Sequence, residues 1–221
     1  MCSRGQRRRF ICRCRPRRRD TGVTIVYVVA TAGHVDHGKS TLVRALTGME
    51  PDRWAEERRR GMTIDLGFAW TTLGTAGLDT ATSDTATIAF VDVPGHERFV
   101  PNMLAGAGAV PAVLLVVAAD EGWMPQTEEH VAALDALAVH NAVLAVTRSD
   151  LADPGPVVTD ALSRLARTTL GEVEAVVVAV RPDGGTQGLD ALRAALLRML
   201  RALPDADDAA AVRLWIDRSF T

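Results

Sequence analysis

The 221-residue sequence predicts an α/β protein in which a mostly parallel sheet carries helices on both faces. Apolar runs of strand length alternate with segments of helical spacing along most of the chain. Several of these runs, such as 113–119, are hydrophobic on both faces, which is typical of buried parallel strands. Because 48% of the residues are apolar and 24% are charged, the chain can bury a sizeable core and wholesale disorder is excluded.

The predicted elements follow one another in a regular order. The expected strands are 24–31, 67–72, 87–92, 113–119, 142–147 and 173–180, and the expected helices are 40–46, 126–139, 157–170 and 189–200. The polar segment 47–65 is expected to be a long exposed loop with one helical turn at 54–59, and 74–85 a hairpin tip.

The ends of the chain differ from its body. The first 20 residues hold nine arginines and one acid, so residues 1–22 are expected to be a basic disordered tail. The alternatives are residues upstream of the true start that were read as coding, a segment that contacts RNA or phosphate, and a transit peptide. Residues 23–203 form the α/β domain. Residues 204–210 are expected to be a linker, and 211–221 the first strand of a further, truncated domain.

Composition excludes several classes of function. Residues 21–221 hold 16 basic and 26 acidic side chains, a balance that argues against general coating of nucleic acid. The longest apolar stretches are too short to span a bilayer, so we expect no membrane association. All three cysteines lie in the first 14 residues, which leaves no disulfide framework in the body and suits a reducing cytoplasm.

One motif concerns the only lysine of the chain, which otherwise uses 24 arginines. The string Gly33-x-x-x-x-Gly38-Lys39-Ser40 lies between a predicted strand and a predicted helix, as a phosphate-binding loop does. Backbone amides and the helix start would bind phosphate, Lys39 would reach the β- and γ-phosphates, and the Ser40 hydroxyl would bind Mg²⁺. The motif therefore predicts a P-loop NTPase.

Four further residues have the spacing that such a site requires. Asp92 ends a predicted strand and can hold Mg²⁺ through water, and the Gly95 amide three residues later can contact a γ-phosphate. Thr63, in the long loop, could complete the Mg²⁺ shell. His96 could orient the water that attacks the γ-phosphate, although a lone histidine is often structural.

A third motif follows the predicted strand 142–147. The Asp150 carboxylate can accept both N–H groups of guanine, which adenine does not offer. An ordinary helix N-cap at Asp150 or Asp153 is the alternative. Within the glycine-rich loop, His34 and His37 are expected to face solvent or to support the loop rather than to bind metal. Asp36 either balances a bound cation or points outward.

Together these strings resemble the translational GTPases, and within them the selenocysteine-specific elongation factors (SelB). The resemblance rests on the strings GHVDHGKS (33–40), RGMTIDLGF (60–68), DVPGHERFVPNMLAG (92–106), LVVAADEGWMPQTEE (115–129) and RLWIDRSFT (213–221). It covers roughly residues 28–221 and implies that 23–203 is a GTP-binding (G) domain followed by the start of a β-barrel.

The resemblance implies a role for each matching residue. His96 would position the hydrolytic water, and the metal ligands would be Ser40, Thr63 and Asp92. The residues that would bind GTP or GDP are Gly33, His34, Val35, Asp36, His37, Gly38, Lys39, Ser40, Thr41, Asp92, Gly95, Thr147, Arg148, Asp150, Ala179 and Val180.

Two strings depart from the family pattern. The guanine motif commonly begins Asn-Lys, whereas this chain has Thr147-Arg148, and the later Ser-Ala motif is replaced by Ala179-Val180-Arg181. Weak nucleotide affinity is therefore one expectation.

The implied function is that of a cytoplasmic, monomeric GTPase domain stimulated by the ribosome. Selenocysteyl-tRNA and the selenocysteine-insertion element of the messenger RNA would be bound only through domains absent from this sequence. The alternatives are a non-hydrolysing nucleotide-binding module, a factor of the elongation factor Tu type, and a P-loop ATPase or kinase.

Overall fold

The computed structural model describes residues 26–51, 66–74, 85–94 and 110–204. The predicted basic tail, the helical turn at 54–59, most of the predicted linker and the strand at 211–221 lie outside these residues. The same holds for three predicted site residues, Thr63, Gly95 and His96.

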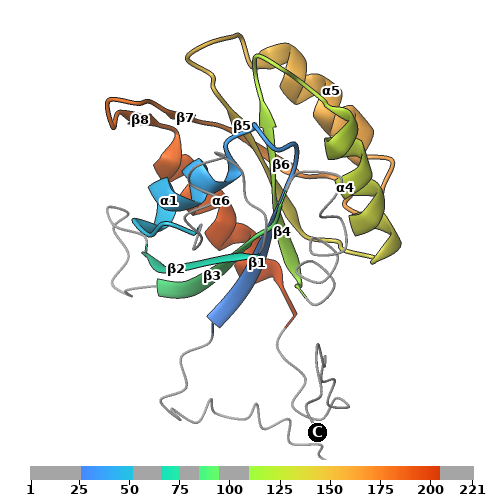
Figure 1. The fold of residues 1–221 in the computed structure, drawn as a ribbon. Coiled ribbons are helices and arrows are strands. Elements are labelled where there is room, and N and C mark those ends of the chain that lie inside the picture. The colour runs from blue at the N-terminus through green and yellow to red at the C-terminus, as the bar shows by residue number, and fades with distance from the viewer. Residues whose placement is uncertain (1–25, 52–65, 75–84, 95–109, 205–221) are drawn as a thin grey trace, which may run out of the picture.

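The described residues form a three-layer α/β fold around a six-stranded sheet (Figure 1). The order across the sheet is β2-β3-β1-β4-β5-β6, and every neighbouring pair is parallel except β2 and β3. The strands are β1 (Val26–Ala32), β2 (Gly67–Gly74), β3 (Thr85–Asp92), β4 (Ala112–Ala118), β5 (Ala142–Thr147) and β6 (Glu174–Val177). This confirms the predicted fold class.

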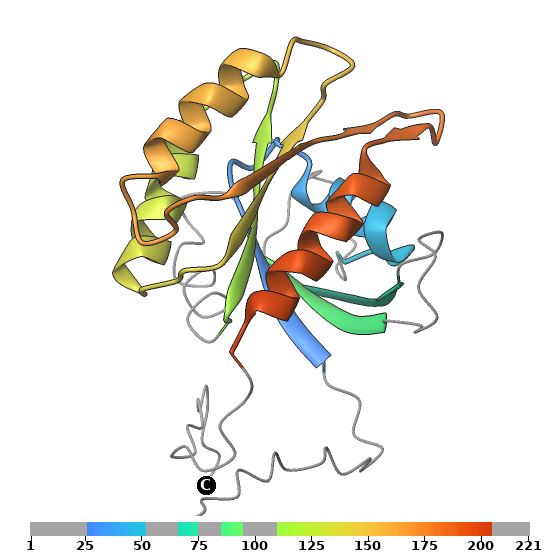
Figure 2. The ribbon, with the colours of Figure 1, turned by 180° about the vertical axis from the view of Figure 1, so that it is seen from behind.

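Helices cover both faces of the sheet, as the two opposite views show (Figures 1 and 2). On one face, α1 (Lys39–Thr47) and α6 (Leu189–Ala202) bury leucines such as Leu42 and Leu196. On the other, α4 (Pro125–Ala136) and α5 (Gly155–Leu165) pack through side chains such as Leu134 and Leu165. Every residue of β4 is buried between the two layers, which explains its uninterrupted apolar sequence.

Two predicted helices end earlier than expected. The helix predicted to run to residue 139 ends at Ala136, because Ala138 has a φ of 53°, which no α-helix accommodates. The helix predicted over 157–170 is shorter at its C-terminus and ends at Leu165.

Among the described helices, none has the length and apolar character needed to cross a bilayer.

The strand predicted over 173–180 is divided in two. Val178 still donates its amide to Val146 O at 2.8 Å, but β7 (Ala179–Val180) then leaves the main sheet. It pairs antiparallel with β8 (Thr186–Gln187), which the sequence does not reveal because two residues show no periodicity. This pairing directs Val180 toward the start of α1 rather than along the sheet edge.

The topology determines where a ligand can bind. β1 lies between β3 and β4. The strands β2 and β3, which follow it in the chain, lie on one side of β1, and the later strands β4, β5 and β6 lie on the other. In open α/β sheets, ligands bind outside the carboxyl ends of the strands at such a switch point. The segment after β1, residues 33–38, lies there.

Candidate functional site

The loop between β1 and α1 depends on glycine at its first position. Gly33 has a φ of +128°, and a Cβ atom there would lie 2.1 Å from Val116 O of β4. No other residue fits this close approach of two backbones. Gly38, with a φ of +80°, is the N-cap of α1, so the cap residue has no side chain to bond the first amides of the helix. These amides and the helix dipole form an anion-binding geometry.

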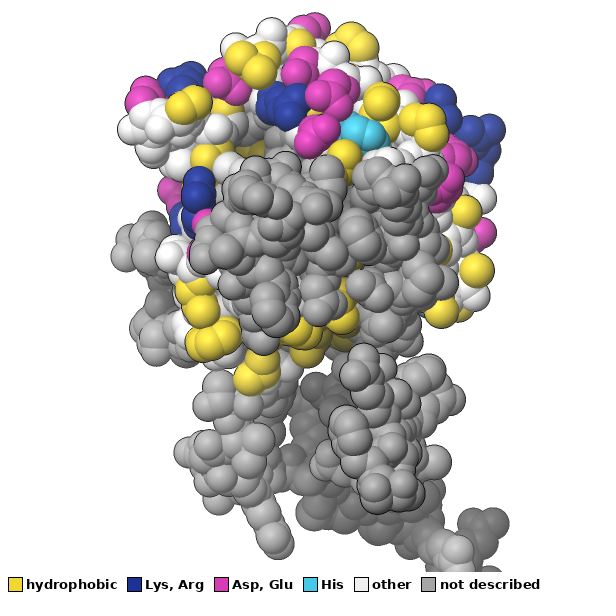
Figure 3. All heavy atoms as spheres, viewed as in Figure 1, with side chains coloured by type: hydrophobic (Ala, Val, Ile, Leu, Met, Phe, Trp, Pro, Cys, Tyr) yellow, Lys and Arg dark blue, Asp and Glu magenta, His cyan; other side chains and the backbone are white. Residues whose placement is uncertain are grey.

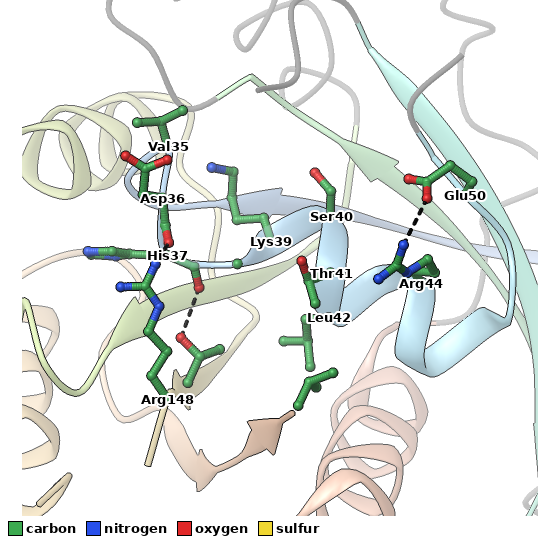
Figure 4. A pocket seen from close by; sticks show the side chains of 13 residues that line it. Val35, Asp36, His37, Lys39, Ser40, Thr41, Leu42, Arg44, Glu50 and Arg148 are labelled. Atoms are coloured by element: carbon green, nitrogen blue, oxygen red, sulfur yellow. Dashed lines mark hydrogen bonds and ion pairs between the residues drawn. The ribbon is translucent and has the colours of Figure 1, made fainter. Parts of the chain in front are cut away.

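Lys39 begins α1 and is buried, with 4% of its surface exposed. Its Nζ atom donates to Gly33 O at 3.1 Å and to His34 O at 2.8 Å, so the ammonium group holds the loop curved around itself. Figure 4 shows Lys39, Ser40 and Thr41 projecting from the first turn of α1. The predicted phosphate-binding residues are thus brought together as the motif requires.

Side chains from other elements fix the backbone of this loop. The Thr147 hydroxyl at the end of β5 donates to His37 O at 2.8 Å. Gln126 Oε1 of α4 accepts the Val35 amide at 3.3 Å. Arg148 donates to the carbonyl oxygen of Asp36, and Asp36 itself is an exposed residue. The loop is therefore held in place by contacts with β5, α4 and the segment after β5.

Two buried histidines support the loop from below. His130 of α4 accepts the Gly33 amide at its Nδ1 atom, 2.9 Å away, and burial lowers its pKa to about 4. His37 is fully buried, its Nδ1 lies 3.3 Å from Val116 O, and burial lowers its pKa to about 4 as well. Both rings are neutral at pH 7. Of the two predicted roles for His37, loop support agrees with this geometry, whereas solvent exposure is wrong.

A buried carboxylate at the end of β3 faces the start of α1. The Thr31 hydroxyl donates to Asp92 Oδ1 at 2.7 Å and accepts the Val93 amide at 3.0 Å, which fixes the carboxylate. Among the described residues, Asp92 Oδ2 has no hydrogen-bond partner. Burial raises the pKa of Asp92, although the charge of Lys39 and the nearby hydroxyl groups of Ser40 and Thr31 lower it. A buried, oriented carboxylate oxygen beside a serine hydroxyl is a donor set that suits Mg²⁺.

A pocket of about 590 Å³ opens above this loop (Figure 4). Predicted nucleotide-binding residues form most of its lining, which comprises Val35, Asp36, His37, Gly38, Lys39, Ser40, Thr41, Leu42, Arg44, Glu50, Thr147, Arg148 and Val180. The sequence motifs did not include Leu42, Arg44 or Glu50. Arg44 Nη1 lies 3.2 Å from Glu50 Oε2, so an ion pair closes the pocket on the side of α1.

Ion pairs surround the predicted guanine end of the pocket. Arg148, at a φ of +55°, places its Nη1 atom 3.0 Å from Asp120 Oδ2 and 2.8 Å from Glu121 Oε1. The Asp150 side chain is 21% exposed, and its Oδ2 lies 3.8 Å from Arg181 Nε. On the face in Figure 3, charged side chains of both signs gather on the upper part of the described surface. The two departures from the family pattern, at Arg148 and Arg181, thus both pair with acidic residues.

Not every predicted residue lines the pocket. Gly33, His34, Asp92, Asp150 and Ala179 lie outside its lining, although Gly33, His34 and Asp92 contact residues that form it. The supporting roles of Thr31, His130 and Glu121 had no signal in the motifs. A buried histidine in the string PQTEEH resembles any other helix residue until the fold brings it to Gly33.

Comparison with known proteins identifies the family. Residues 24–201 match the model of the elongation factor Tu GTP binding domain. The selenocysteine-specific elongation factor of Escherichia coli (strain K12) is 43% identical over 199 residues, which cover 88% of this chain and 30% of that protein. The translation initiation factor 2 subunit gamma of Halobacterium salinarum (strain ATCC 29341 / DSM 671 / R1) is 37% identical over 217 residues, covering 87% of this chain and 50% of that protein.

Solved structures agree with this assignment. A bacterial selenocysteine-specific elongation factor, EF-Sec, superposes with a TM-score of 0.71 at 33% identity over 82% of this chain and 30% of its own. SelB from Methanococcus maripaludis, solved in complex with the GTP analogue GppNHp, has a TM-score of 0.65 at 25% identity over 81% of this chain and 35% of its own. The chain therefore spans about a third of the length of the selenocysteine-specific factors that it matches. By sequence and fold it belongs to the family of elongation factor Tu GTP-binding domains, as the G domain of a SelB-type translational GTPase.

Proposed function

We propose that the pocket above residues 33–40 binds GTP and GDP with Mg²⁺, and that the domain hydrolyses GTP within a factor that delivers selenocysteyl-tRNA to the ribosome. The observation that carries the proposal is the loop from Gly33 to Lys39. It has a glycine that no other residue can replace, a buried ammonium group and an uncapped helix start at one place.

The loop supplies the charge that a triphosphate needs. In the described structure the Lys39 ammonium group donates to two loop carbonyl oxygens, Gly33 O and His34 O. A β- or γ-phosphate oxygen in the pocket would accept a charge-assisted hydrogen bond from the same group. The amides at the start of α1 would donate to the remaining phosphate oxygens without any change of backbone, so this geometry is preorganised.

The residues at the end of β3 fit a magnesium ion. Asp92 Oδ2 and the Ser40 hydroxyl would hold it, with Thr63 as a further proposed ligand. When bound, Mg²⁺ would neutralise charge on the β- and γ-phosphates. Thr31 keeps Asp92 oriented, and because burial raises the pKa of Asp92, the cation also stabilises the ionised carboxylate.

Recognition of the base is assigned to the segment after β5. Asp150 would accept the two N–H groups of guanine after leaving Arg181, from which it is separated by 3.8 Å. The aliphatic stem of Arg148 would lie along the base, while its guanidinium group stays paired with Asp120 and Glu121. A backbone amide near Ala179 or Val180 would contact guanine O6.

Hydrolysis is assigned to His96, which would orient water toward the γ-phosphate when the ribosome aligns it. The Gly95 amide would contact the γ-phosphate beside it. Because the chain spans 30% of the length of the Escherichia coli relative, binding of selenocysteyl-tRNA and of the messenger-RNA element is assigned to other parts of a complete factor. We propose a monomer that acts in the cytoplasm.

Nucleotide binding is tested by calorimetry on the 221-residue protein with GDP, GTP and ATP in the presence of Mg²⁺. We expect GDP and GTP to bind and ATP not to displace them. Lys39→Ala is expected to lose at least about 100-fold in affinity, because it removes charge-assisted hydrogen bonds to phosphate. Lys39→Arg should not restore binding, since a planar guanidinium group does not fit a cradle built for a compact ammonium group. Absence of heat with both guanine nucleotides would refute the proposal.

Hydrolysis is tested separately by single-turnover measurements with and without ribosomes. We expect stimulation by ribosomes, and we expect His96→Ala to retain GDP binding while it loses stimulated turnover. Persistent binding without hydrolysis in the wild-type protein would favour the non-hydrolysing alternative. Unchanged stimulated turnover in His96→Ala would remove His96 from the mechanism.

A further inference from the structure

Three side chains meet beside the phosphate loop. His34 and His37 come from the loop itself, and Glu121 comes from the turn after β4. The atoms that these side chains offer as ligands all lie within 4.8 Å of one another. His37 Nε2 is 3.5 Å and His34 Nδ1 is 3.9 Å from Glu121 Oε2. His37 also lines the pocket, whereas His34 and Glu121 do not, so the cluster adjoins the proposed phosphate site.

The hydrogen bonds of His37 fix its tautomer. Its Nδ1 atom lies 3.3 Å from Val116 O, and a carbonyl oxygen can only accept, so the proton is on Nδ1. Nε2 then carries a lone pair, is buried, and has no hydrogen-bond partner among the described residues. A ring whose Nδ1–H is held by a backbone carbonyl and whose Nε2 is bare has the arrangement of a metal-bound histidine.

The other two ligand atoms are also unprotonated. His34 Nδ1 accepts a long hydrogen bond of 3.4 Å from the Asp36 amide, so this nitrogen is unprotonated, and its lone pair would exchange that weak hydrogen bond for a metal ion. Arg148 donates to Glu121 Oε1 at 2.8 Å and thereby turns Oε2 toward the two rings. Three lone-pair atoms therefore converge with no hydrogen between them. Such an arrangement is repulsive unless a proton or a cation lies at its centre.

A proton is a poor occupant of this space. Burial lowers the pKa of His37 to about 4, and burial is also the main cause that lowers the pKa of His34. Burial opposes any positive charge here, and the acidic groups Asp36, Asp120 and Glu121 favour it against Lys39 and Arg148. A metal ion would bond to all three ligand atoms at once, which offsets the cost of burying its charge more fully than a proton on one ring nitrogen does.

The donor set selects the kind of metal. Two imidazole nitrogens and one carboxylate oxygen suit Zn²⁺ and similar transition metals, whereas Mg²⁺ and Ca²⁺ prefer oxygen ligands throughout. Neighbouring ligands of a tetrahedral zinc ion lie about 3.3 Å apart, since Zn–N and Zn–O bonds are about 2.0–2.1 Å long. The observed separations of 3.5 and 3.9 Å are within a small side-chain movement of that geometry.

We propose that His34, His37 and Glu121 form a binding site for one borderline transition-metal ion of the Zn²⁺ type. Three protein ligands leave the fourth position of a tetrahedral site for water. The ion would connect the phosphate loop to the turn after β4, and through Glu121 to Arg148 at the base end of the pocket.

The test is a titration of the nucleotide-free 221-residue protein, without an affinity tag, with Co²⁺ in a large excess of Mg²⁺. Cys2→Ser, Cys12→Ser and Cys14→Ser are present in every sample, since thiolates would otherwise bind the same ions. We expect visible absorption of tetrahedral Co²⁺ that saturates at one equivalent and is abolished by Zn²⁺. Because no nucleotide is added, the outcome is independent of GTP binding.

Two variants keep the inference open to refutation. Glu121→Gln and His34→Ala are preferred to a change at the buried His37, which risks the fold. Each is expected to weaken binding by at least the roughly 10- to 100-fold that loss of a supporting group costs at metal sites. His140→Ala, an exposed histidine with its Nδ1 3.0 Å from Thr169 O, is the matched control and should bind normally. Absence of the tetrahedral spectrum, or unchanged affinity in both folded variants, would overturn the inference.

Discussion

The two ends of the pocket are built in different ways. At the phosphate end, the buried side chains of His37 and Lys39 bond to backbone carbonyl oxygens, and the Gly33 amide donates to the buried His130 ring. At the base end, Arg148 and Asp150 are held by ion pairs to partly exposed side chains. The first arrangement tolerates almost no change, whereas surface ion pairs stabilise weakly and can be exchanged. This explains why the phosphate motif matches its family pattern while the guanine motifs depart from it.

The largest expected effect breaks the phosphate end directly. Gly33→Ala places a Cβ atom 2.1 Å from Val116 O, so β1 and β4 must separate or the loop must change course. We expect a loss of more than about 3 kcal/mol in the free energy of unfolding, measured by urea denaturation. Gly171→Ala is the matched control, because Gly171 also has a positive φ of +62° but no atom within 4 Å of its Cβ position. The free energy of unfolding of Gly171→Ala should fall by only about 1–2 kcal/mol, which is what a left-handed backbone conformation costs a residue with a side chain. Equal losses in the two variants would show that the close approach at Gly33 is not what matters.

At the base end, Asp150→Asn tests whether Asp150 reads guanine at all. An amide cannot accept both N–H groups of guanine but can donate to the extra carbonyl oxygen of xanthine. We therefore expect GDP affinity to fall about 100-fold and the preference to shift toward xanthosine diphosphate, measured by calorimetry. Asp153→Asn is the control, since Asp153 only accepts the Gly155 amide at 3.0 Å beside α5. An unchanged preference in Asp150→Asn would remove Asp150 from base recognition; it does not cap α5, whose N-cap is Pro154.

Acid should destabilise the fold through the buried histidine beneath the phosphate loop. The pKa of His130 is lowered from 6.5 to about 4 by burial, so the unfolded chain binds its proton first as the pH falls. The contribution of neutral His130 to the free energy of unfolding is then complete above pH 6.5 and is lost between pH 6.5 and about 4. We expect His130→Gln to remove roughly 2 kcal/mol of this pH dependence, measured by urea denaturation across that range. His140→Gln, at an exposed position, is the matched control. A wild-type profile that is flat over this interval would contradict the neutral, buried state of His130.

The smallest expected effect is at Arg148. Arg148→Ala removes the contacts to Asp120, Glu121 and the Asp36 carbonyl, but the side chain is 31% exposed. Exposed ion pairs contribute up to about 1 kcal/mol each, so GDP affinity should fall by less than about tenfold. Arg148→Lys should be close to the wild-type protein. A loss as large as that of Lys39→Ala would show that the base end is as rigid as the phosphate end, and the comparison above would fail.

Much of the fold and the phosphate site could be predicted from sequence, for a physical reason. The strand, loop and helix that contain Gly33 and Lys39 are continuous in the chain, so local pattern determines them. β7 and β8 could not be predicted because two-residue strands carry no periodicity. The contact of His130 with Gly33 spans 97 residues, and the pair of Arg148 with Glu121 spans 27. Such contacts depend on how α4 and β5 pack, which no local motif encodes. The roles of Thr63, Gly95 and His96 remain predictions, since these residues lie outside the described part of the chain.

The glycine at the N-cap of α1 makes the stability of the protein depend on bound nucleotide. Neither a side chain on Gly38 nor an acidic residue in the first turn offsets the positive end of this helix. A phosphate bound there completes the helix, so ligand and fold are thermodynamically linked. We expect the thermal midpoint to climb with guanine-nucleotide concentration, and proteases to degrade the empty protein faster than the loaded one. Cellular abundance would then follow the nucleotide supply even before any catalysis takes place.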